Sequence, residues 1–90
     1  MTNTILRLKP VLHARGLSRS SHYLDIQHGL FTRPVSIGER AVGWPETEVT
    51  TINAARIAGR TKEEIRALVV KLEDARKTAD RRPQLKGVPK

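Results

Sequence analysis

The chain has no cysteine and only three aromatic residues, one each of phenylalanine, tryptophan and tyrosine. The absence of cysteine excludes disulfide bonds and thiolate metal sites, and it suits a reducing cytoplasm. Three aromatic side chains are too few for the base-stacking platforms of proteins that bind single-stranded nucleic acid. No apolar run approaches the ~18 residues of a membrane span, and the N-terminus lacks the apolar core of a signal peptide. We therefore expect a cytoplasmic protein without a membrane partner.

The chain is strongly basic. Its 17 lysine and arginine residues outnumber 9 acidic residues, which gives a formal net charge of +8 in 90 residues. A basic domain of this size favours a polyanionic partner, because binding to phosphates releases condensed counterions. The alternative is a solvated surface whose charge only keeps the protein soluble. With so few aromatic residues, duplex DNA is the better prediction.

The stretch from Leu12 to Trp44 organises the chain, and its first part predicts two short helices. Pro10 suits the first position of the first helix, and Gly16 ends it, because glycine accepts the left-handed conformation there. Ser18 is a suitable N-cap for a second helix over residues 19–28. The link between the two helices is as short as a helix-turn-helix requires.

The second part of this stretch predicts a two-stranded hairpin. Residues 33–37 and 41–44 alternate apolar with polar or small residues, and Gly38 lies in the short loop between them. We expect four side chains to form its inner face: Val35, Ile37, Val42 and Trp44. A helix-turn-helix followed by a hairpin predicts a mostly helical fold with a small β-hairpin wing, the winged helix-turn-helix.

The exposed face of the second helix is ambiguous in the sequence. One orientation buries Tyr23 in a stripe with Ile26 and Leu30. The other buries His22 with Ile26. It turns three side chains toward solvent: Ser20, Tyr23 and Gln27. The residues alone leave both orientations open.

The C-terminal third predicts one long amphipathic helix. Thr61 and Glu64 form a capping-box pattern directly before an apolar repeat. We therefore divide the chain into a winged unit at residues 1–60, this helix at 61–82 and a disordered basic tail at 83–90. The apolar stripe either packs on the winged unit or forms a homodimer, and four residues would carry that interface: Ile65, Leu68, Val69 and Leu72.

The sequence shows no catalytic or metal-binding pattern. His13, His22 and His28 lack the spacing of zinc ligands, and there is no glycine-rich phosphate loop. We predict that the protein is not an enzyme and uses no cofactor, metal or small-molecule substrate.

Two sequence blocks, Gly-Leu-Ser-Arg-Ser at residues 16–20 and Arg-Ala-Val-Gly-Trp at residues 40–44, carry a family resemblance. With their spacing over about residues 8–60, they resemble the AlpA-like prophage regulators, small winged helix-turn-helix proteins related to the MerR and excisionase group. Three residues in the second helix depart from the usual family pattern. His22 stands where the family usually has an aliphatic residue, and Leu24 stands where it often has arginine. Asp25 occupies a position that is commonly apolar.

The resemblance implies sequence-specific binding of duplex DNA, at a promoter of a prophage or mobile element, in the bacterial nucleoid. It also favours the orientation in which Ser20 and Tyr23 face DNA. We predict that four residues read base edges in the major groove: Ser20, Ser21, Tyr23 and Gln27. We predict phosphate contacts from Arg15 and Arg19, and wing contacts to the backbone or minor groove from Arg33 and Arg40.

Two alternatives remain beside a transcriptional regulator. The first is an excisionase-type factor that bends DNA by binding repeated sites. The second is an antitoxin-like adaptor that binds another protein through the helix at residues 61–82.

Overall fold

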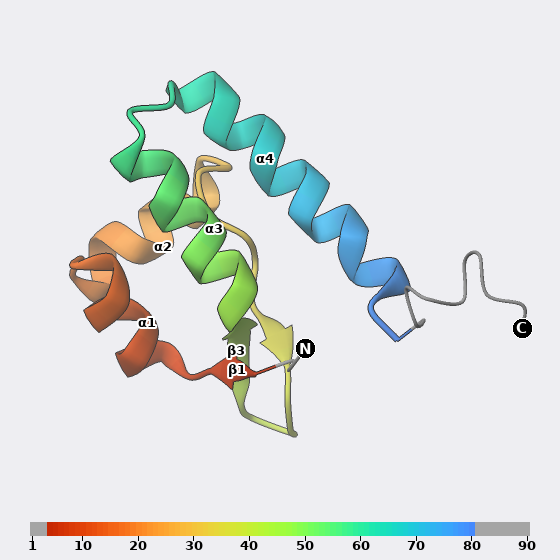
Figure 1. Cartoon of the computed structure of the whole chain (residues 1–90). Helices are drawn as coiled ribbons and strands as arrows, with labels where there is room; N and C mark the ends of the chain where they lie inside the picture. The colour runs from red at the N-terminus through yellow and green to blue at the C-terminus, as the bar shows by residue number, and fades with distance from the viewer. Residues whose placement is uncertain (1–3, 81–90) are drawn as a thin grey trace, which may run out of the picture.

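The computed structural model describes residues 4–80. Its sequence of elements is mostly helical with one small antiparallel sheet, which confirms the predicted fold class (Figure 1). The elements are β1 (Ile5–Leu6), α1 (Leu8–Arg15), α2 (Arg19–Gln27), β2 (Val35–Ser36), β3 (Val42–Pro45), α3 (Glu46–Ile57), α4 (Lys62–Ala75) and a 3-10 turn, η1 (Arg76–Thr78). The tail predicted at residues 83–90 lies outside the described residues.

Local sequence signals set the helix ends largely as predicted. Gly16 closes α1 with a φ of 69°, and Ser18 Oγ accepts a hydrogen bond from the Ser21 amide at 3.2 Å. In the capping box of α4, the Glu64 amide donates to Thr61 Oγ1 at 3.1 Å and the Thr61 amide donates to Glu64 Oε1 at 2.9 Å. The sequence predicts the start of α1 at Pro10, but the helix begins two residues earlier, at Leu8. Pro10 still lies in the first turn, where its missing N–H costs no helical hydrogen bond.

The sheet has the order β1-β3-β2, and its register corrects the predicted hairpin face. Val35 pairs with Gly43, so the side chains of Val35 and Ile37 lie on the Gly43 side of the sheet. Val42 and Trp44 point to the opposite side, because successive residues of a strand alternate between faces. Trp44 is fully buried, whereas Ile37 and Val42 are about 40% exposed. The four residues therefore do not form one inner face, since alternation within each strand does not fix the pairing between strands.

One hydrophobic core joins the winged unit to α4. Trp44 lies within it and donates its indole N–H to the Thr32 carbonyl at 2.9 Å. Ile65 and Val69 of α4 are 8% and 5% exposed and pack in the same core. The other buried apolar residues are Val11, Phe31, Val49 and Ile52.

The burial of the α4 stripe favours one of its two predicted roles, packing on the winged unit. Ile65 and Val69 are covered by the chain's own core, and Leu68 and Leu72 are partly buried against it. Figure 1 shows α4 running from the turn after α3 back past the winged unit. A partner could reach this stripe only after α4 had left the core, so the stripe is not a free dimer surface. No helix within residues 4–80 is long and apolar enough to cross a membrane.

The packing of α4 predicts a contrast between two adjacent valines. Val69→Ala removes two buried methyl groups and should lower the free energy of unfolding by about 2 kcal/mol. Val70→Ala is the matched control, because Val70 is 63% exposed, and it should change stability by less than about 0.5 kcal/mol. Urea unfolding at two protein concentrations measures both. A midpoint that rises with protein concentration would show that the stripe belongs to a dimer instead.

Candidate nucleic-acid interface

The exposed face of α2 is set by the burial of His22. The His22 side chain is fully buried, whereas Ser20, Ser21 and Gln27 are exposed. This supports the orientation with His22 inside. Tyr23 departs from it in part, since its side chain is half-buried and packs against the core instead of turning fully outward.

Tyr23 lies at the border between the core and the surface. Its ring meets the rings of His22 and Trp44 edge-on, with centroids 5.1 and 6.4 Å apart. On its other side the Arg19 guanidinium lies 5.8 Å from the ring centroid, within reach of a cation–π interaction. Tyr23 therefore supports Arg19 at the start of α2.

Arg15 is a buried structural residue, so its predicted phosphate contact is wrong. Its side chain is 0% exposed, and its Nη2 pairs with Asp25 Oδ2 at 2.7 Å. The carbon of its guanidinium also lies 3.9 Å from the centre of the Phe31 ring. From the last turn of α1 this side chain points toward α2 and the segment after it, where DNA cannot reach it.

His22 accepts the second hydrogen bond of Arg15. Nη1 of Arg15 donates to Nδ1 of His22 at 2.8 Å, which requires that this ring nitrogen carry no proton. Burial, together with the positive charge of Arg15, lowers the pKa of His22 to about 4, so the ring is neutral at physiological pH. Asp25 also meets Nη1 of Arg56 on α3, at 3.5 Å. The network therefore reaches from α1 through α2 to α3.

The two predicted wing arginines have different surroundings. Arg40 lies exposed in the turn between β2 and β3. Arg33 instead faces α4, where its Nη2 pairs with Glu73 Oε1 at 3.1 Å and its amide donates to Glu73 Oε2 at 2.8 Å. Partial burial opposes ionisation of Glu73, but these hydrogen bonds outweigh it and hold the pKa of Glu73 below its usual value. Arg33 thus ties the wing entrance to α4.

An open concavity of about 620 Å³ lies between the start of α1, the start of α2 and the wing. Its lining includes four cations: Arg7, Lys9, Arg19 and Arg40. No carboxylate of residues 4–80 lines it. Leu8, Pro10, Tyr23 and Val42 complete it. We call this surface the basic concavity. Arg7 and Lys9 are absent from the predicted site because they precede Pro10, the predicted start of the first helix, whereas the structure places Lys9 in the first turn of α1. The Arg-Leu-Lys run before Pro10 is a visible signal in the sequence.

A second concavity, of about 500 Å³, lies at the other end of α2. Arg56, Arg60 and Lys62 line it, but so does the carboxylate of Asp25. Its charge is therefore mixed, unlike that of the basic concavity. Within residues 4–80 no cluster of three or more histidine, aspartate or glutamate side chains could hold a metal ion.

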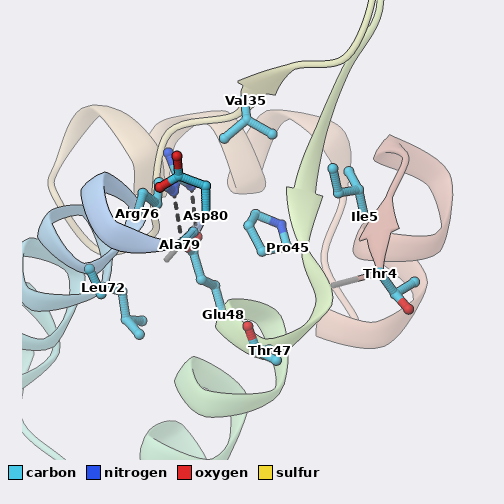
Figure 2. A pocket seen from close by; sticks show the side chains of 11 residues that line it. Thr4, Ile5, Val35, Pro45, Thr47, Glu48, Leu72, Arg76, Ala79 and Asp80 are labelled. Carbon is cyan, nitrogen blue, oxygen red and sulfur yellow. Dashed lines mark hydrogen bonds and ion pairs between the residues drawn. The ribbon is translucent and has the colours of Figure 1, made fainter. Parts of the chain in front are cut away.

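A third hollow is an apolar cleft of about 490 Å³ between the outer face of the sheet and the end of α4. Figure 2 shows Ile5, Val35 and Pro45 on the sheet side and the last turns of α4 on the other. The Arg76–Glu48 ion pair, with an N–O distance of 2.7 Å, bridges α3 and the end of α4 beside it. This pair fixes the end of α4.

Comparison with known proteins identifies the family. Residues 4–56, more than half of the chain, match the family model described as prophage CP4-57 regulatory protein (AlpA). The chain belongs to the AlpA family of prophage regulatory proteins. This AlpA family chain is also 47% identical over 57 residues to an uncharacterized protein, ORF88, of Enterobacteria phage P4. That match covers 63% of this chain and 65% of the phage protein, slightly less than two thirds of its length. No solved structure matches.

The family match confirms the resemblance and locates it in the structure. The matched residues run from β1 to near the end of α3 and include α2, the wing and all four cations of the basic concavity. α4 lies outside the match.

The buried His22 predicts a specific dependence of stability on pH. The unfolded histidine titrates near 6.5 and the folded one near 4, so the unfolded state binds more protons between these values. The free energy of unfolding should therefore fall as the pH drops through this window, by at most about 1.4 kcal/mol per pH unit from this group. Denaturant unfolding at several pH values measures the slope.

His22→Leu provides the control, because leucine is of similar size to histidine but cannot titrate. Acidic groups contribute to both proteins, so the difference between the two slopes reports His22. Identical slopes from pH 6.5 to 4 would contradict a buried, neutral His22.

Proposed function

We propose that this chain is a cytoplasmic, sequence-specific regulator that binds duplex DNA of a prophage or other mobile element. The observation that carries this proposal is the position of the basic concavity directly beside the first turn of α2. The exposed face of this helix bears Ser20, Ser21 and Gln27, together with the half-exposed Leu24. Membership of a family of prophage regulatory proteins supports the same function.

In the proposed complex the exposed face of α2 enters the major groove. Ser20, Ser21 and Gln27 project from this face and can donate to or accept from base edges. Tyr23, half-buried, would reach DNA only with its outer edge. Arg19, at the start of α2, would contact a phosphate, and Arg40, at the tip of the wing, the backbone or minor groove.

The structure bears differently on the two alternative functions, the protein-binding adaptor and the excision factor. An adaptor acting through α4 loses its main support, because the apolar stripe that would bind a partner lies in the core. An excision factor that bends DNA uses the same interface as a regulator and stays a hypothesis. Direct repeats with induced curvature in a footprint would favour excision, and a single operator over a promoter would favour regulation.

The proposal is tested by selecting binding sites from a random library of ~30-bp duplexes near physiological ionic strength, where non-specific phosphate binding is weak. We expect an enriched motif. Binding that enriches no motif and disappears as salt rises would leave only a basic surface and would refute sequence-specific recognition.

Two substitutions should separate base reading from phosphate binding. Gln27→Ala should relax the selected motif at one or two positions, with a loss of about 1–3 kcal/mol of discrimination there. Arg40→Gln should weaken selected and unrelated duplexes alike and reduce the salt slope by about one. Fluorescence anisotropy titrations on both duplexes, over a range of salt, measure these effects. A motif unchanged by Gln27→Ala would remove Gln27 from the base-reading set.

A further inference from the structure

We propose that the basic concavity binds the sugar–phosphate backbone of one DNA strand, with Arg7, the N-cap of α1, and Lys9, in the first turn of α1, as phosphate contacts. This inference rests on the proposed DNA-binding function and deepens it. It assigns a role to the entrance and first turn of α1, to which the proposed contacts of α2 and the wing give none.

The first argument is the gathering of like charges. Four cations come from three separate parts of the chain, namely the segment that enters α1, the first turn of α2 and the wing turn. None of the four forms an ion pair within residues 4–80, whereas Arg15, Arg33, Arg56, Arg66 and Arg76 all do. Like charges around one concavity repel each other, and a polyanion in the concavity would relieve that repulsion.

The second argument is the apolar part of the lining. Leu8, Pro10 and Val42 lie among the cations. A nucleic-acid strand presents anionic phosphates and, between them, the carbon faces of its sugars. Alternating cationic and apolar side chains therefore suit such a strand better than a free inorganic anion, which has no apolar part. The volume of about 620 Å³ also exceeds what a single phosphate group needs.

The third argument is the contrast with the other end of α2. There Arg56, Arg60 and Lys62 surround a concavity of similar size, but Asp25 lines it and pairs with Arg56. A phosphate placed there would meet a carboxylate. The concavity at the first turn of α2 thus offers cations without a carboxylate, whereas the other offers cations together with one, and this difference favours the basic concavity for the backbone.

The first test compares two lysines that differ in position. Lys9→Gln and Lys71→Gln each remove one exposed positive charge, but Lys71 lies on α4 and outside the concavity. The logarithm of the association constant is plotted against the logarithm of salt concentration for the selected duplex and for an unrelated duplex of equal length. Lys9→Gln should reduce the slope by about one on both duplexes and weaken binding about fivefold near 0.15 M salt. Arg7→Gln should behave alike, and Lys71→Gln should match the wild type.

The outcomes separate the two proposals. A wild type that selects a motif, with Lys9→Gln and Arg7→Gln both matching Lys71→Gln in slope, would overturn the backbone site and leave the proposed function standing. A wild type that selects no motif would refute the function itself. Unchanged thermal midpoints verify that these surface variants are folded.

A second measurement identifies the phosphate. Methylphosphonates, which are neutral, replace the phosphates of the selected duplex one at a time. At the phosphate that Lys9 contacts, the replacement should weaken the wild type several-fold and leave Lys9→Gln nearly unaffected, because the contact is already absent. Losses that are equal in both proteins at every position would overturn the assignment.

Discussion

The orientation of α2 depends on the buried guanidinium of Arg15. Removing this charge from water is costly, and the cost is offset only because Asp25 pairs with it at 2.7 Å and His22 accepts from it at 2.8 Å. Both partners lie on α2, while Arg15 ends α1. The angle between the two helices is therefore fixed by directional hydrogen bonds as well as by apolar packing, and the face of α2 opposite these bonds is left exposed to solvent.

The same network explains two departures from the AlpA-like pattern. His22 and Asp25 occupy positions where these proteins usually carry apolar residues, and both turn out to contact one arginine. Burial keeps His22 neutral, as the fall of its pKa to about 4 shows, and only the neutral ring can accept a hydrogen bond from a cation. The three polar residues thus replace apolar packing as a unit, since any one of them alone would be a buried polar group without its partner.

Features decided by local sequence could be predicted, and those decided by distant partners could not. Gly16, Ser18 and the capping box at Thr61 act within a few residues, so the helix ends followed from the sequence. The face of the hairpin depended on pairing with another strand and was predicted wrongly. Arg15 was assigned to the surface because a single arginine in a basic chain shows no sign of its partners seven and ten residues away.

The net charge of +8 can be related to function only when the cations that have a partner within residues 4–80 are separated from those that have none there. Three arginines stabilise the position of α4. Arg33, at the wing entrance, pairs with Glu73 of α4, and Arg66 of α4 donates to the His28 carbonyl at the end of α2. Arg76, directly after α4, pairs with Glu48 of α3. Their charge is largely neutralised or used within the protein. The four cations of the basic concavity have no such partner among residues 4–80 and adjoin the exposed face of α2. Four cations without an ion pair in the described part of the chain therefore gather where this face begins, so that attraction to a phosphate backbone and presentation of α2 to the groove would favour the same orientation on DNA.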